Sequence, residues 1–379
     1  MSVSRRRFLK TSALTASVPL VSSLSMNSAF AGAGGEVDLT LGYQPGALRM
    51  NLNENPLGPP ASAVAAAQSS IPLTNRYVSP ALLKTLLGEY KGVDRDWVIV
   101  GNGSTEILKL APLAFARHPD RNVVSALETW NKTAHYAGQL GAEVRYVNLL
   151  KNQHYEFDID GMLKQVDKNT GIFFVVNPNN PTGALISFDN LKRIADSLPE
   201  ETIFIIDEAY AQFNPEQRTG IDLVKEGYHN VLVTRTFSKA WGLAALRCGY
   251  GIGHPDVLKK IAEHGCDAAS LNIGGYSALQ AALGEPQQVD RARAYSDEVS
   301  AFFKQQSEKM GLTLVTGPLA LPFFLFDLGE NAAAIAKKLR AKNVFVRHVG
   351  SWGLPHHIRV SWALEEDNHK FFRELKALV

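Results

Sequence analysis

Cysteine is scarce in this chain, whose 379 residues include only Cys248 and Cys266. Two cysteines are too few for a disulfide framework and lack the paired spacing of a zinc site, so we expect both to be small buried residues. The ten histidines form no H-x-x-x-H pair and no H-E-x-x-H motif, and only His356 and His357 are close together. The sequence therefore predicts no metal site.

An excess of charge of one sign is also missing. The chain has 39 basic and 37 acidic residues, and four of the basic ones fall within the first ten positions, Arg5, Arg6, Arg7 and Lys10. A dedicated nucleic-acid binder would show a basic excess or a basic stripe, so we expect no nucleic-acid partner. The hydrophobic share of 45% is enough for the core of one large or two medium domains.

A long hydrophobic run is missing too. Residues 11–31 carry no charge, but serine, threonine, asparagine and proline interrupt them, whereas a membrane-spanning helix needs about 20 mostly apolar residues. Residues 4–10 read Ser-Arg-Arg-Arg-Phe-Leu-Lys, and Ala29-Phe30-Ala31 suits signal peptidase. This layout resembles a bacterial Tat signal peptide. We expect residues 1–31 to be that signal, cleaved near Ala31 after the Tat translocase has exported the folded protein to the periplasm. A membrane anchor or a disordered basic tail is the alternative.

Short apolar runs alternate with helical patterns through the middle of the chain, for instance the helices expected over Thr105–Phe115 and Phe188–Ser197. This alternation implies a mainly parallel sheet with helices on both faces. After Gly274 the pattern changes to long helices, and then to two strands with a helix between them. The predicted strands are Trp97–Val100, Asn122–Ala126, Val144–Leu149, Gly171–Asn177, Thr202–Asp207, Val231–Thr236 and Gly249–Gly253, followed by Pro322–Asp327 and His357–Trp362.

The predicted fold class is therefore α/β, with a mainly parallel seven-stranded sheet in a large domain and a smaller α+β domain. We expect residues 32–63 to form an N-terminal arm and part of the small domain. The large domain is expected over residues 64–283 and the small C-terminal domain over residues 284–379.

Several predicted strands run directly into reactive or polar side chains. Asn177 to Gly183 follow one strand, Asp207-Glu208-Ala209-Tyr210 end the next, and Thr236-Phe237-Ser238-Lys239 end a third. The turn Gly101 to Glu106 precedes a helix and suits an anion. Because carboxyl ends of parallel strands share one edge, these groups should meet there.

A lysine, a carboxylate and a phosphate cradle at one edge are what pyridoxal phosphate requires. Lys239 would form the Schiff base with the cofactor, and an aspartate would keep the ring nitrogen protonated. A nucleotide site is disfavoured, since the chain has no G-x-x-x-x-G-K-[ST] motif.

Together these motifs closely resemble fold-type I, class I and II aminotransferases, and within them the histidinol-phosphate aminotransferase branch. The resemblance rests on Tyr43 to Gly46, Asn53 to Gly58, Asn177 to Gly183, Asp207 to Tyr210 and Arg235 to Arg247, and it covers nearly all of the mature chain. It implies a pyridoxal-phosphate-dependent aminotransferase that moves an amino group between an amino donor and a 2-oxo acid by a ping-pong route. It also suggests a cis peptide bond before Pro181.

The resemblance assigns a role to each motif residue. Lys239, Asp207 and Tyr210 are implied to be catalytic, and Tyr210 and Asn180 to contact the phenolic oxygen of the cofactor. Trp130 would stack on the cofactor ring. The phosphate would be held by Gly103, Ser104, Thr105, Thr236 and Arg247, together with Tyr77 of the partner subunit in a homodimer.

The substrate is less well defined by the sequence. Arg359 matches the arginine that binds a substrate carboxylate or phosphate, and Tyr43 and Asn55 are further candidate substrate contacts. Histidine biosynthesis is cytoplasmic, which conflicts with an export signal, so we expect a free α-amino acid as donor. Its pocket would be built partly from Tyr43, Trp130 and Trp352. Their aromatic surface would favour an apolar or aromatic side chain, but His356 and His357 could equally admit an acidic one, so the side chain stays open. A decarboxylase, lyase or racemase of the same fold, or a non-catalytic periplasmic binding protein, is the alternative.

Overall fold

The computed structural model describes residues 41–151, 154–315 and 317–379. The chain divides at Pro45 into two units, of which the larger runs from Gly46 to Val379. The expected signal peptide, residues 1–31, lies outside the described residues. Within the described part, none of the helices is both long and apolar enough to span a membrane.

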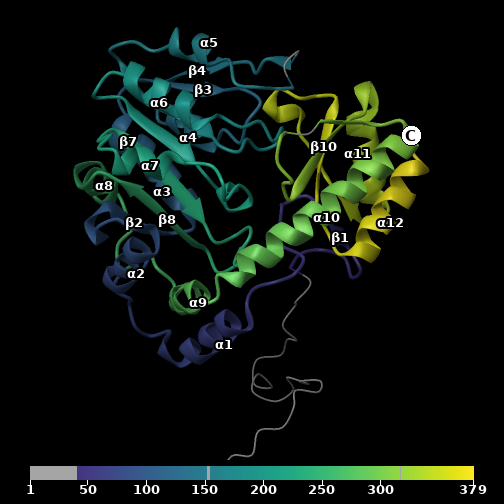
Figure 1. The fold of residues 1–379 in the computed structure, drawn as a ribbon, viewed down its shortest axis with the longest axis horizontal. Coiled ribbons are helices and arrows are strands. Elements are labelled where there is room, and N and C mark those ends of the chain that lie inside the picture. The colour runs from purple at the N-terminus through teal and green to yellow at the C-terminus, as the bar shows by residue number, and fades with distance from the viewer. Residues whose placement is uncertain (1–40, 152–153, 316) are drawn as a thin grey trace, which may run out of the picture. The chain divides into compact units, whose positions relative to one another are not determined.

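A seven-stranded sheet carries the first two thirds of this unit (Figure 1). Its strand order is β2-β8-β7-β6-β5-β3-β4, and every strand predicted for it is present within two residues of the predicted ends. β3 to β7 are parallel to one another, which confirms the mainly parallel sheet. The bounds are β2 Val98–Asn102, β3 Asn122–Ala126, β4 Glu143–Val147, β5 Thr170–Val176, β6 Ile203–Asp207, β7 Val231–Thr236 and β8 Cys248–Gly253.

β8 departs from the expected alternation of strand and helix. It pairs antiparallel with both β7 and β2. No helix lies in residues 237–247, the loop between β7 and β8. A parallel crossover needs a dozen or more residues, so this shorter loop returns the chain beside β7 in the opposite direction. The loop carries Lys239 and Arg247.

Helices cover both faces of the sheet because the buried strands are apolar on both sides. On β5, Phe173 and Val175 belong to one core, while Ile172 and Phe174 belong to the other. The first core also contains buried residues of α2, α6, α7 and α9, and the second contains those of α3, α4 and α8. The bounds are α1 Ala61–Ser70, α2 Ala81–Lys91, α3 Ser104–Phe115, α4 Lys132–Gln139, α5 Ile159–Leu163, α6 Phe188–Ser197, α7 Gly220–Lys225, α8 Pro255–Ala262 and α9 Ile273–Leu283.

The C-terminal part forms a second, antiparallel sheet with the order β12-β13-β10-β9. The long helix α10 leads from α9 to this sheet (Figure 1), and Phe303 on α10 stacks on Phe324 of β10. The predicted strands β10 and β13 are confirmed, and the division of domains at residue 284 stays a prediction. The bounds are α10 Gln287–Met310, β9 Thr313–Val315, β10 Phe323–Asp327, α11 Ala332–Ala341, β11 Val344–Phe345, β12 Arg347–His348, β13 His357–Ser361 and α12 Glu365–Lys376, with β1 Leu48–Arg49 parallel to β11.

Candidate active site

A cavity of about 510 Å³ opens where the carboxyl ends of β5, β6 and β7 meet the start of α3. Val176, Asp207 and Thr236 are the last residues of those strands, and Ser104 is the first of α3. Eleven residues predicted for the site line this cavity: Ser104, Thr105, Trp130, Asn180, Asp207, Tyr210, Thr236, Lys239, Arg247, Trp352 and Arg359. Gly103, which was also predicted, directly precedes Ser104 but is not part of the lining. The structure therefore joins motifs that are far apart in the sequence at the predicted edge of the sheet.

Lys239 reaches the cavity from the loop that follows β7. Its Nζ donates a hydrogen bond to the carbonyl oxygen of Leu52 at 2.9 Å. Burial and the nearby cations Arg359 and Arg247 lower the pKa of Lys239 to about 7. A large share of Lys239 is therefore neutral near pH 7, and a neutral amine is the nucleophilic form.

Asp207 is a buried carboxylate with little to compensate its charge. Its Oδ1 accepts a hydrogen bond from Thr234 Oγ1 at 2.9 Å, and the residue is 4% exposed. Burial raises the pKa of Asp207 to about 7. A cation against this carboxylate would offset its burial, and the protonated pyridine nitrogen of pyridoxal phosphate is such a cation.

Tyr210 and Asn180 stand on the side of the cavity that faces the antiparallel sheet. Tyr210 Oη accepts a hydrogen bond from Asn53 Nδ2 at 2.8 Å, and burial raises the pKa of Tyr210 to about 12. Asn180 Oδ1 accepts from Arg359 Nη1 at 2.8 Å. The peptide bond before Pro181 is cis, as predicted, and so is the one before Pro178.

The start of α3 forms an anion cradle together with Arg247. Gly103 precedes this helix with a φ of +79°, and a Cβ there would lie 2.4 Å from Arg247 Nη2. A side chain at Gly249 would likewise meet the Ser104 backbone nitrogen at 2.0 Å. Only glycines thus allow the guanidinium and the backbone N–H groups of the helix start to converge. A phosphate fits such a place.

These observations fit pyridoxal phosphate. The buried Asp207, Lys239 with its lowered pKa and the anion cradle line one cavity, with Trp130 as an aromatic surface beside them. We call Asp207, Tyr210, Thr236, Lys239 and Arg247 the cofactor wall.

Arg347 is a cavity residue that sequence reasoning missed. It lies on β12 directly opposite Arg359 on β13, and both arginines line the cavity. The Trp352 ring lies 5.0 Å from the Arg347 guanidinium carbon and 5.7 Å from that of Arg359. Burial, with Arg347 adding to it, lowers the pKa of Arg359 to about 10. We call Arg347, Trp352 and Arg359 the substrate wall.

Three other predicted site residues lie outside this lining. Asn55 donates through Nδ2 to the Ala240 carbonyl at 2.9 Å, and so supports the loop after Lys239. Tyr77 is 84% exposed, so its predicted reach toward a phosphate needs a second subunit. Tyr43 belongs to the separate unit that ends at Pro45, and its substrate contact stays a prediction.

The expectation that His356 and His357 contact an acidic substrate is wrong, because neither residue lines the cavity. His357 is buried, and its Nε2 lies 3.0 Å from Tyr155 Oη and 3.8 Å from Asp327 Oδ2. These partners engage the His357 ring away from the cavity.

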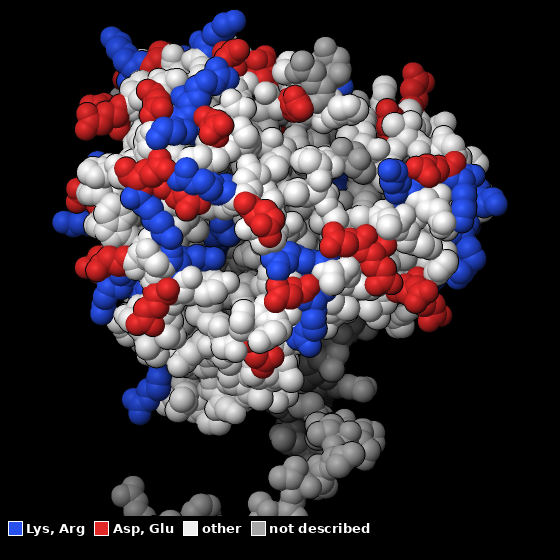
Figure 2. All heavy atoms as spheres, viewed as in Figure 1, with Lys and Arg blue, Asp and Glu red and all other residues white. Residues whose placement is uncertain are grey.

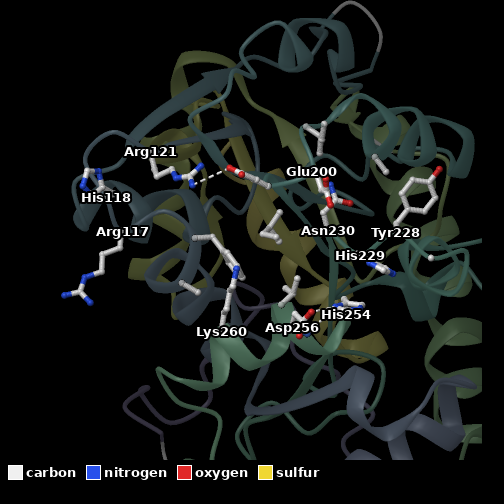
Figure 3. A pocket seen from close by; sticks show the side chains of 18 residues that line it. Arg117, His118, Arg121, Glu200, Tyr228, His229, Asn230, His254, Asp256 and Lys260 are labelled. Atoms are coloured by element: carbon white, nitrogen blue, oxygen red, sulfur yellow. Dashed lines mark hydrogen bonds and ion pairs between the residues drawn. The ribbon is translucent and has the colours of Figure 1, made fainter.

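A larger hollow of about 1070 Å³ lies at the opposite, amino-terminal ends of β6 and β7 (Figure 3). It contains none of the predicted site residues. Its lining mixes basic side chains with the acidic Glu200, Glu201 and Asp256, and Arg121 pairs with Glu201 at 3.9 Å. Acidic and basic side chains are also interspersed over most of the face shown in Figure 2. Among the described residues no group of His, Cys, Asp or Glu could hold a metal ion.

Comparison with known proteins places these observations in context. The family model for aminotransferase class I and II matches residues 46–373. The histidinol-phosphate aminotransferase of Symbiobacterium thermophilum is 34% identical over 332 residues, which cover 87% of this chain and 90% of that protein. Histidinol-phosphate aminotransferase 2 of Ralstonia nicotianae is 35% identical over 330 residues, which cover 85% and 86%. Among solved structures, histidinol-phosphate aminotransferase from Sinorhizobium meliloti in complex with pyridoxal-5'-phosphate has a TM-score of 0.79 at 24% identity, covering 88% of this chain and 92% of that one.

Proposed function

The chain belongs to the class I and II aminotransferase family and is a pyridoxal-phosphate-dependent aminotransferase, and on this premise we propose that its amino donor is a free α-amino acid with an acidic side chain. The observation that carries this proposal is the pair of arginines, Arg347 and Arg359, held against Trp352 in one cavity. Guanidinium groups bind carboxylates through paired, charge-assisted hydrogen bonds.

Two anionic groups on the substrate match the two arginines. Arg359 is 4% exposed and already bonded to Asn180, which fixes its direction for the carboxylate next to the amine. Arg347 is half-buried at the cavity edge and suits the more distant side-chain carboxylate. The 2-oxo acid acceptor enters the same cavity in the second half-reaction and meets the same two cations.

The cofactor wall supplies the chemistry that both half-reactions share. When bound, pyridoxal phosphate withdraws electrons from the bonds at the amine-bearing carbon of the substrate. Asp207 holds a proton on the cofactor ring nitrogen, while Arg247 and the start of α3 fix the phosphate end. Lys239 Nζ, with its pKa lowered to about 7, can take up and return a proton near neutral pH.

A single-turnover screen of amino donors tests the proposal. Enzyme loaded with pyridoxal phosphate is mixed with one donor, and the loss of cofactor absorbance measures amino transfer. We expect acidic amino acids to react at least about tenfold faster than apolar ones of similar size, because one charge-assisted hydrogen bond contributes about 1.5–3 kcal/mol. A hundredfold preference for histidinol phosphate over every amino acid would contradict the proposal and make histidinol phosphate the donor.

We also propose a homodimer in which Tyr77 acts across the interface. Apolar side chains that follow one another on α1, on residues 71–73 and on α2 are exposed, among them Ile71, Leu73 and Leu82. A second copy of this chain would cover them and bring its Tyr77 toward the phosphate cradle. Sedimentation should give a dimer that dissociates in Ile71→Lys/Leu73→Lys and persists in Leu364→Lys, where the replaced leucine is equally exposed. A fully active wild-type monomer would overturn this arrangement.

Export through the Tat pathway completes the proposal and is supported by residues 4–31 of the sequence. Replacing Arg5 and Arg6 by lysine should leave a full-length precursor in the cytoplasm while keeping the positive charge. An unchanged periplasmic yield would rule out this route.

A further inference from the structure

A third cavity, of about 300 Å³, lies between the end of α2, α7 and the first turns of α10. Arg235 of β7 lines this cavity and does not line the active-site cavity. Its neighbours in the strand, Thr234 and Thr236, serve the active site, and successive side chains of a strand point to opposite faces. This third cavity is therefore on the other side of β7 from the cofactor wall.

The charges that line this cavity are unbalanced. Four cations, Lys91, Lys225, Arg235 and Arg293, face a single carboxylate, Asp222. Glu208 neutralises Arg235 through a buried ion pair, and Asp290 pairs with Arg293. In the described part of the chain no ion pair involves Lys91 or Lys225.

The two unpaired lysines are close together. Lys225 Nζ lies 3.5 Å from where a Cβ of Gly92 would be, and Gly92 follows Lys91 directly. Asp222 Oδ2 accepts a hydrogen bond from the Thr219 backbone at 2.7 Å, so this carboxylate is already engaged. Burial, Arg235 and Lys225 lower the pKa of Lys91 to about 7. Cations kept together without a counter-ion favour an anion between them.

A further polar atom points to the kind of anion. Gln212 lines the same cavity, and its Oε1 is buried with no hydrogen-bond partner. A buried acceptor without a donor is costly. Phosphate at neutral pH carries an O–H group that can donate to this oxygen, whereas sulfate and chloride carry none.

We propose that this cavity is a second anion site, which binds inorganic phosphate. Lys91 and Lys225 hold the phosphate oxygens, and Gln212 Oε1 accepts a hydrogen bond from the phosphate O–H. The site is separate from the cradle at α3, which holds the phosphate of the cofactor.

Competitive acetylation of the holoenzyme tests this site. With the cofactor in place its phosphate occupies the cradle at α3, so added phosphate does not report on that cradle. Trace acetic anhydride labels neutral lysines, and peptide mass spectrometry compares Lys91 with the exposed Lys337 in the same sample. Bound phosphate raises the pKa of Lys91, so labelling near pH 7 should fall at least about fivefold relative to chloride at equal ionic strength. Sulfate should protect less, and so should glycerol 2-phosphate, because a phosphate monoester has largely lost its O–H group near pH 7.

Variants distinguish specific phosphate binding in this cavity from a nonspecific effect of ions on Lys91 labelling. Lys225→Gln should raise the phosphate concentration for half-protection at least about tenfold, because one charged partner is lost. Gln212→Leu should abolish the preference for phosphate over sulfate, and Lys338→Gln, at another exposed lysine outside the cavity, should change neither. Equal labelling of Lys91 in phosphate and chloride, or no labelling of Lys91 in any buffer, would overturn the proposal. Amino transfer by Lys225→Gln should match wild type.

Discussion

The cofactor wall and the substrate wall face the same cavity but are built differently. Four of the five residues of the cofactor wall end buried parallel strands or follow them within a few positions, and the sheet register places them together. The fifth, Arg247, directly precedes β8. The substrate wall comes from β12, from the short helical turn Gly350–Trp352 and from β13. The difference teaches that the shared chemistry is fixed by short motifs on a rigid sheet, whereas substrate choice depends on residues joined only by the antiparallel pairing of short strands.

The largest expected effect concerns Lys239 and separates it from Lys91, whose pKa is also lowered to about 7. Lys239→Ala should lower kcat at least about a thousandfold, because a nucleophile and proton carrier is lost. Lys91→Gln should keep the wild-type kcat. A similar loss of kcat in the two variants, measured in a steady-state assay, would contradict the special role of Lys239. It would mean that a low lysine pKa, and not a position in the cofactor wall, determines the contribution to kcat.

The second largest loss of kcat is expected for substitution of Asp207, since Asp207 acts on the cofactor through its charge. Asp207→Asn keeps the size and the Thr234 contact but removes the charge, and we expect kcat to fall about a hundredfold to a thousandfold. Asp327→Asn is the matched control, because Asp327 also ends a strand, β10, but outside the cavity. A kcat near wild type for Asp207→Asn would remove this residue from the chemistry.

Substitutions in the substrate wall should change KM rather than kcat. Arg347→Gln should raise the KM for acidic donors about tenfold to a hundredfold and leave apolar donors little changed, since it removes one charged contact. Arg340→Gln is the control, because Arg340 also lies against an aromatic ring, 5.4 Å from Phe345, but outside the cavity. An equal loss for acidic and apolar donors would assign Arg347 a structural role.

The smallest expected effect is on pH dependence. Attachment of pyridoxal phosphate to the apoenzyme needs neutral Lys239, so its rate should rise with pH and level off above the Lys239 pKa of about 7. One pH unit below that value the rate should be about tenfold lower than on the plateau. Stopped-flow absorbance measures it, and Lys91→Gln should leave the midpoint unchanged. A midpoint near the ordinary lysine value of 10.5 would contradict the burial of Lys239 among cations.

The sequence predicted where Asp207, Tyr210, Thr236 and Lys239 meet because these residues end or follow apolar strands. The roles of the lysine and the aspartate follow from their residue types, whereas those of Tyr210, Thr236 and Arg247 were implied by the family resemblance. Arg347 could not be predicted this way. Its strand, β12, is two residues long, and its position depends on pairing with Arg359.

Roles that depend on partners far away in the sequence could not be predicted either. His357 has a reactive side chain in a predicted strand, but Tyr155, about two hundred positions earlier, engages its ring. Lys91 ends an ordinary helix, and its pKa is lowered by burial and by the nearby Arg235 and Lys225, which the sequence does not reveal. The direction of β8 was missed because the alternating pattern does not show that the loop before it is too short for a crossover.

Borohydride reduction of the enzyme loaded with one equivalent of pyridoxal phosphate, followed by peptide mapping, tests the central claim most directly. Lys239 and Lys91 share a pKa of about 7, but only Lys239 lies beside Asp207, Tyr210 and the cradle at α3. The account predicts that the reduced cofactor is found on Lys239 and that Lys91 remains unmodified. A cofactor attached to Lys91, or divided between the two lysines, would contradict it.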